Sequence, residues 1–365
     1  MDRVKAAVAT TVFAALLYGF WTEAVRSGLV STLGGHIGSA FACFALLLAV
    51  LWFAGFGALE WVARALNSQT VNHLTVGKIP HSTKRRLNGA PRPDSQARLN
   101  GAPARLLVPA VLAIPYVVFA VPRGEFRWIY FAGLALLPVV LAAVLSTIRS
   151  TTTAEDGALR AIKKFEWQDC VVLVTIAVVL EARVFGGAWP YNGLGSMPKL
   201  YLADVALYLY LVVRRLEGVG FSFVPRLDDL KIGVREWLFF LPIALGLGFA
   251  THFIWFVPRH PGVGQVIGAL LVTFLLTAIP EELFFRGILQ NLLEPRLGRM
   301  WALIVTACLF GLSHFHKGAA FNWRYVIIAA IAGIFYGRAW RVRRRLFASS
   351  LTHTLVDVVW GLWFR

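Results

Sequence analysis

Long apolar segments recur along almost the whole chain, and they constrain its fold more than any other feature. Eleven candidate membrane spans are centred near residues 14, 49, 114, 138, 178, 206, 248, 277, 308, 332 and 356. A bilayer core requires about 20 apolar residues of helix, and it leaves no water to satisfy exposed backbone groups. Because 58% of the residues are hydrophobic and only 15% are charged, we predict an all-α fold: a polytopic transmembrane helical bundle of about 10–11 spans.

The basic residues predict how these spans are oriented. The net charge of +17 is spread over short loops between apolar runs, and no basic stripe marks a soluble domain. We therefore expect the lipid bilayer as a partner and no nucleic acid. With the amino terminus inside, most Lys and Arg residues fall in cytoplasmic loops, as the positive-inside rule requires. Richness in Ala, Gly and Arg favours a bacterial inner membrane. Residues 6–21 are expected to remain a span, because residues 22–25 offer no small-residue cleavage site.

One long polar segment, at residues 67–105, divides the early spans. It carries the hexapeptide Arg86-Leu87-Asn88-Gly89-Ala90-Pro91 and repeats it at 98–103. Its Gly, Pro, Asn and basic residues predict a flexible cytoplasmic linker, with an anionic-lipid contact as the alternative. We expect two domains. Residues 1–148 form an N-terminal four-span extension with this flexible basic loop, and residues 149–365 form a seven-span core whose motifs lie within 278–357.

Two adjacent carboxylates and an arginine interrupt the apolar run Ala278-Ile279-Pro280-Glu281-Glu282-Leu283-Phe284-Phe285-Arg286-Gly287. Ionisable groups at bilayer depth are costly and mark functional sites by default. On a helix from about Gly264 to Leu293, Glu282 and Arg286 are four residues apart and can neutralise each other. We therefore assign these two residues to structural support. Glu281 points to another side and remains available for chemistry.

Later spans place further polar groups at a similar depth. One carries Phe310-Gly311-Leu312-Ser313-His314, and the last carries His353-Thr354-Leu355-Val356-Asp357. A carboxylate and a histidine can activate water for attack on a carbonyl, and a second histidine can stabilise the oxyanion. Alternatively, His314, His353 and Asp357 could hold a divalent metal such as zinc. No His-Glu-x-x-His segment supports the metal interpretation, and the choice between the two stays open.

In these residues the chain resembles the CPBP intramembrane proteases, which include the type II CAAX prenyl endopeptidases and bacterial Abi, or bacteriocin-immunity, proteins. The family pattern Glu-Glu-x-x-x-Arg, Phe-x-x-x-His and His-x-x-x-Asn or Asp occurs here in order, over 281–286, 310–314 and 353–357. The resemblance implies a membrane hydrolase in which Glu281 and His314 activate water, while His353 and Asp357 stabilise the oxyanion. Asp357 stands where the prenyl endopeptidases carry an amide, which favours a role as a metal ligand or as an orienter of His353.

The predicted function is therefore intramembrane hydrolysis of a peptide bond in a membrane-anchored, lipidated or exported protein. This would be a CAAX-type protease of the metallo or glutamate type, and CAAX is here a family name and not a substrate. Two other functions remain as alternatives. One is a non-proteolytic immunity or scaffold protein with the same fold, and the other is a proton-coupled transporter, for which the chain lacks an internal repeat of its span pattern.

Overall fold

The computed structural model describes residues 3–26, 28–59, 102–148, 165–317 and 322–364. Most of these residues are helical, and the only β-type pairing among them is an isolated bridge between Phe256 and Phe364. The predicted all-α fold is confirmed.

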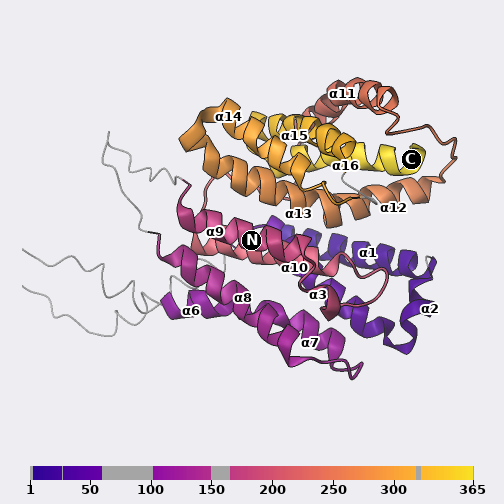
Figure 1. The fold of residues 1–365 in the computed structure, drawn as a ribbon. Coiled ribbons are helices and arrows are strands. Elements are labelled where there is room, and N and C mark those ends of the chain that lie inside the picture. The colour runs from indigo at the N-terminus through magenta and orange to yellow at the C-terminus, as the bar shows by residue number, and fades with distance from the viewer. Residues whose placement is uncertain (1–2, 27, 60–101, 149–164, 318–321, 365) are drawn as a thin grey trace, which may run out of the picture.

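The helices up to residue 213 occupy the lower and middle part of Figure 1. They are α1 (Arg3–Arg26), α2 (Leu29–Leu33), η1 (Gly34–His36), α3 (Ile37–Gly55), α6 (Ala102–Leu107), η2 (Val108–Ala113), α7 (Ile114–Ala120), α8 (Trp128–Ser146), α9 (Trp167–Glu181), η3 (Gly186–Ala188), α10 (Met197–Leu207) and η4 (Tyr208–Val213). We refer to this group as the lower body.

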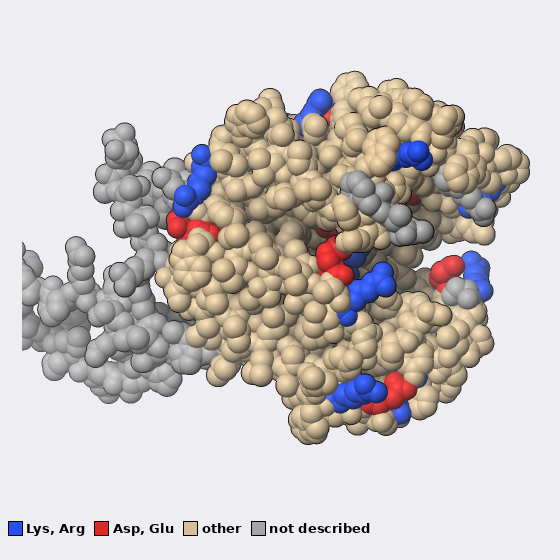
Figure 2. Space-filling model, viewed as in Figure 1, with Lys and Arg blue, Asp and Glu red and all other residues tan. Residues whose placement is uncertain are grey.

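The remaining helices form the upper body (Figure 1). They are α11 (Leu227–Ala250), α12 (Val263–Thr273), η5 (Phe274–Ala278), α13 (Ile279–Glu282), η6 (Leu283–Gln290), α14 (Asn291–Leu312), α15 (Trp323–Arg343) and α16 (Leu346–Trp363). Figure 2 shows a hollow between the two bodies on the same face, with acidic and basic side chains near its middle. The helix α10 joins the bodies, because it contacts α3 and α9 on one side and α13 and η6 on the other.

Six described helical segments are long and apolar enough to cross a membrane: Val4–Arg26, Leu29–Gly55, Trp128–Ser146, Leu227–Ala250, Val263–Leu312 and Trp323–Arg343. They include seven of the predicted span centres, since 277 and 308 lie in one 50-residue segment. That segment bends at Gly298, whose φ of 74° lies in the left-handed region that glycine adopts without strain. The other four centres, 114, 178, 206 and 356, lie in shorter or less apolar helices. The protein is an integral membrane protein.

The predicted domain boundary, between residues 148 and 149, lies at the edge of a stretch outside the described residues. Most of the basic loop at 67–105 and its duplicated hexapeptide also lie outside them, and α6 begins at Ala102. The division into 1–148 and 149–365 thus stays a prediction. In space, α9 and α10 pack against α8 and α3, within the lower body.

Arginines at the end of α15 fix the start of α16. The ion pairs are Arg338–Glu236, Arg341–Glu294, Arg343–Asp228, Arg344–Glu294 and Arg345–Asp229. In the last of these, Arg345 Nε lies 2.8 Å from Asp229 Oδ1, and its Nη2 donates to the Val224 carbonyl. One residue later, the Leu346 amide donates to the carbonyl of Gly220. These contacts set where the last helix enters the upper body.

Adjacent aspartates allow a test of this arrangement. Asp229 is fully buried with Arg345, whereas Asp228 is exposed with Arg343. We expect Asp229→Asn to lower the free energy of unfolding by about 3–5 kcal/mol, because it leaves a half-buried guanidinium without its counter-ion. We expect Asp228→Asn to cost at most about 1 kcal/mol, as for other exposed pairs. Thermal unfolding in detergent measures both, and equal losses would contradict the assignment.

Candidate active site

The paired carboxylates lie on the short helix α13, between two stretches of π-helix. Pro280 occupies the second position of α13. Its ring has no N–H to donate and would crowd the carbonyl of Leu276 in an ordinary α-helix. The wider turns of η5 and η6 accommodate this defect, and such π turns are frequent at functional sites. The predicted helix from Gly264 to Leu293 is therefore continuous but locally widened around its carboxylates.

Glu282 is the centre of a fully buried polar cluster. Its Oε1 accepts from Arg286 Nη1 at 2.9 Å and lies 2.9 Å from His353 Nδ1, and its Oε2 accepts from the hydroxyl of Ser349. Arg286 is fully buried as well, donates to the Gly333 carbonyl and packs over the ring of Phe310. The i,i+4 pair expected from sequence thus also holds α14, α15 and α16 around the site.

His353 lies between carboxylates. Its Nδ1 faces Glu282, as described above. Its Nε2 lies 3.4 Å from Asp357 Oδ2 and 3.8 Å from Glu281 Oε2. The imidazole stacks on Tyr336, with ring centroids 4.6 Å apart and planes inclined by 15°. Because carboxylates only accept hydrogen bonds, both ring nitrogens are placed to donate. Nε2 can then direct its N–H toward an oxygen that gains negative charge.

His314 is held in the opposite role. Its Nδ1 lies 2.9 Å from the carbonyl oxygen of Phe310, and the Ser313 hydroxyl lies 3.2 Å from the same nitrogen. A carbonyl can only accept, so Nδ1 carries the proton and Nε2 keeps its lone pair. The ring also packs between Phe310 and Tyr325. His314 is therefore oriented as an acceptor.

The two histidines share one cavity. A cavity of about 190 Å³ is lined by His314, His353 and Asp357 together with aromatic and aliphatic side chains of α11, α15 and α16. Glu281 reaches this group through His353, and its Oε2 is buried without a hydrogen-bond partner among the described residues. The structure thus brings all six predicted site residues together, in one polar cluster inside the upper body.

Sequence reasoning missed two members of the cluster. Ser349 donates to Glu282, and Lys199 Nζ lies 2.8 Å from Glu281 Oε1. The sequence gives one signal for Lys199, which is its position at the start of the apolar run Met197–Val213. Ser349 gives no signal, because small hydroxyl residues are common between packed membrane helices.

The three candidate metal ligands do not form a metal site as arranged. Both nitrogens of His353 face carboxylates, and Nδ1 of His314 faces a carbonyl. Among the described parts of the chain, no group of three or more His, Cys, Asp or Glu side chains is placed to hold a metal ion. Zinc requires three or four such donors about 2.0–2.3 Å from one point. The geometry therefore does not fit a bound zinc.

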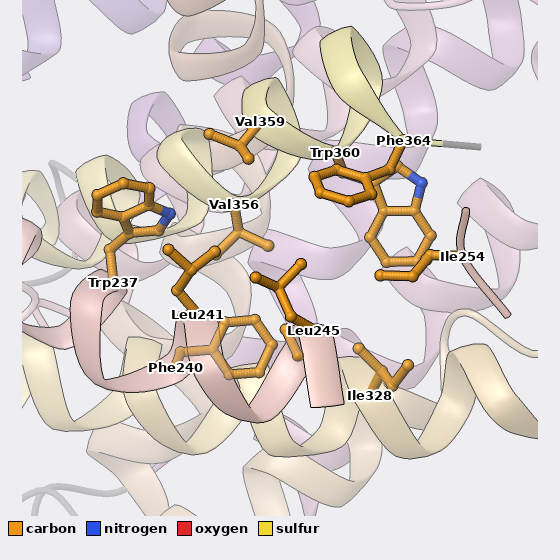
Figure 3. A pocket seen from close by; sticks show the side chains of 11 residues that line it. Trp237, Phe240, Leu241, Leu245, Ile254, Ile328, Val356, Val359, Trp360 and Phe364 are labelled. Atoms are coloured by element: carbon orange, nitrogen blue, oxygen red, sulfur yellow. The ribbon is translucent and has the colours of Figure 1, made fainter. Parts of the chain in front are cut away.

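An apolar pocket of about 40 Å³ adjoins the cavity (Figure 3). Phe240, Ile328, Val356 and Trp360 line both spaces. In the close-up, Leu241 lies beside Val356, with Leu245 next along the same helix. The lining is mainly carbon surface, so the pocket suits a small aliphatic group.

Residues 263–359 match the family described as type II CAAX prenyl endopeptidase Rce1-like. The matched segment contains every residue of the three motifs, and the match confirms the resemblance noted from them. It does not include α10 or any earlier helix. No curated protein and no solved structure is significantly similar to the chain.

The two glutamates should differ in what they contribute to stability. We expect Glu282→Gln to cost about 3–5 kcal/mol, because it leaves Arg286 and His353 buried without their shared counter-ion. Glu281→Gln should cost less than half as much, because an amide oxygen can still accept from Lys199. Thermal unfolding in detergent compares the two single-atom changes directly. The reverse order would contradict the central place of Glu282.

Proposed function

We propose, from the Rce1-like CAAX prenyl endopeptidase family of residues 263–359, that the protein is an intramembrane endopeptidase of the glutamate type. The single observation that supports the mechanism is the position of His353 Nε2, close to Asp357 and to Oε2 of Glu281, which has no hydrogen-bond partner in the described parts of the chain. A proton acceptor and a proton donor thereby lie 3.8 Å apart, and the donor lines a small cavity. The substrate is a peptide bond in a membrane-anchored or lipidated protein, in keeping with the family. The chain itself would lie in a bacterial inner membrane with its amino terminus inside.

The proposed reaction begins with a water molecule between Glu281 and His314. Glu281 Oε2 takes a proton from this water, and the lone pair of His314 Nε2 accepts its second hydrogen bond. The water oxygen forms a bond to the carbonyl carbon while the carbonyl electrons move onto oxygen. His353 Nε2–H stabilises that oxyanion, as preorganised donors do in acyl transfer. When the C–N bond breaks, the proton held by Glu281 passes to the departing amine.

Asp357 orients His353 in this scheme. A carboxylate cannot donate to an oxyanion, so Asp357 cannot replace the amide that the prenyl endopeptidases carry there. It lies one turn further along α16, with Oδ2 3.4 Å from His353 Nε2. Asp357 can accept a hydrogen bond from His353 Nε2–H until the oxyanion forms. The N–H can then donate to the oxyanion instead.

The metal-independent mechanism rests on the donor geometry. Among the residues that the structure describes, no three His, Cys, Asp or Glu side chains are gathered around one point as a metal ion requires. A zinc ion bound by His314, His353 and Asp357 would supply Lewis-acid activation of water. Those side chains would first have to move toward one common point.

Removal of the proton acceptors should abolish proteolysis. We expect Glu281→Gln and His314→Ala each to lower kcat by about 10²–10⁴-fold, the usual contribution of general base catalysis. The matched control is His316→Ala, because His316 is exposed two residues further on and should retain full activity. The measurement is cleavage of membrane-anchored peptides by purified protein in detergent.

Strong chelators added to the same assay should leave the rate unchanged. Loss of activity that zinc restores would overturn the metal-independent mechanism and keep the protease. Full activity in both variants would overturn the assignment of Glu281 and His314. A wild type that cleaves none of the peptides and yet binds a membrane partner would favour the scaffold protein.

The apolar pocket beside the cavity suggests where a substrate side chain lies. We expect Leu241→Trp to fill this pocket and to raise KM about tenfold for peptides with leucine next to the cleaved bond, which corresponds to loss of one or two buried methylenes. Peptides with alanine there should be little affected. Leu238→Trp is the control, because Leu238 lies on the same helix with its side chain exposed. Equal effects on both peptides would place the substrate elsewhere.

A further inference from the structure

The partly buried ion pair between Lys199 and Glu281 lies beside the proposed reaction centre, and Lys199 has no role in the scheme above. Lys199 Nζ lies 2.8 Å from Glu281 Oε1, and their side chains are 24% and 13% exposed. Lys199 sits in the first turn of α10, in the lower body, while Glu281 sits on α13 in the upper body. This pair is one of the contacts through which the two bodies meet.

The pair makes the two oxygens of Glu281 unequal. Oε1 accepts the hydrogen bond from Lys199, whereas Oε2 has no partner among the described residues and lies 3.8 Å from His353 Nε2. A buried carboxylate oxygen without a partner costs free energy unless water or a ligand satisfies it. The free oxygen is thus the one directed at the group formed by His353 and Asp357.

Charge gives a second reason for Lys199 to act on Glu281. The other buried glutamate, Glu282, already has Arg286, Ser349 and His353 as donors. Lys199 supplies the corresponding positive charge for Glu281. Removing it would leave His353, 3.8 Å away, as the nearest positively charged partner of Glu281, and a largely buried carboxylate is costly without a close counter-ion. A compact ammonium on a flexible stem can hold one oxygen and leave the other accessible.

We propose that Lys199 is a positioning residue for the reaction, holding Oε1 of Glu281 so that Oε2 alone serves as the proton acceptor. The proposal rests on the proposed function, and it extends that function beyond the segment 263–359. It makes the lower body part of the active site, because α10 supplies one of the groups on which catalysis depends. The contacts of α10 with α13 and η6 keep the two helices in register for this pair.

The test compares Lys199→Met and Lys199→Arg with the wild type. We expect Lys199→Met to lower kcat by about 10–100-fold with KM changed less than about twofold, since the residue acts through Glu281 and not on the substrate. Lys199→Arg keeps the cation and should recover part of the rate. Lys231→Met is the matched control, because Lys231 is an exposed lysine on α11, and it should have wild-type kinetics.

A double-mutant cycle separates positioning from general stability. In a Glu281→Gln background, Lys199→Met should cause no further loss of residual rate, because the group through which it acts is already gone. An additive loss would overturn the proposal. So would a rise in KM with unchanged kcat, which would assign Lys199 to substrate binding, or a failure of Lys199→Arg to exceed Lys199→Met in rate.

A direct measurement distinguishes this proposal from the proposed function itself. A membrane-permeant carbodiimide should join Lys199 Nζ to the Glu281 carboxyl as an amide, with loss of one water, and peptide mass spectrometry detects the link. An active wild type without the link would overturn the pairing and leave the protease intact. A wild type that forms the link when treated, yet cleaves no peptide when untreated, would overturn the protease function, and with it any role of Lys199 in the reaction.

Discussion

The coordination of Glu282 by three donors is the constraint on which the rest of the structure depends. A carboxylate and a guanidinium, each fully buried, are tolerated only because every strong charge has a partner of opposite sign nearby. Arg286, Ser349 and His353 come from η6 and α16, and Arg286 in turn binds the Gly333 carbonyl on α15. The cluster therefore fixes three helices relative to one another at the depth where the histidines lie.

Charges in this protein serve two separate tasks. The arginines from 338 to 345 pair with acidic residues of α11 and α14, away from the cavity. These pairs fix the position of the first turn of α16. In the inner group of Glu281, Glu282, His353 and Asp357, the last two line the cavity, and Oε2 of Glu281 has no hydrogen-bond partner among the described residues. The outer pairs hold helices together, whereas Glu281 Oε2, next to His353, can take up a proton.

Several features were readable from the sequence because they are local. Apolar runs predicted an all-α membrane protein, since only helices or closed barrels satisfy the backbone in lipid. Spacing by four residues predicted the pairs Glu282–Arg286 and His353–Asp357, which are one helical turn apart in the structure. The three motifs indicated the family that residues 263–359 match. The number of spans did not follow from the apolar runs alone, because residues 263–312 form one long apolar segment that bends at Gly298.

Other features were decided only by the tertiary structure. Lys199 meets Glu281 from 82 positions away, and Glu282 meets His353 from 71 positions away. No periodicity in the sequence predicts such contacts, because they depend on how helices pack and not on the pitch of any one of them. The same packing directs both nitrogens of His353 toward carboxylates and Nδ1 of His314 toward a carbonyl. The sequence by itself determined which chemical groups lie at bilayer depth. Their partners, and hence which oxygens and nitrogens remain free, were decided by the folded arrangement, because hydrogen bonding requires contact within about 3 Å.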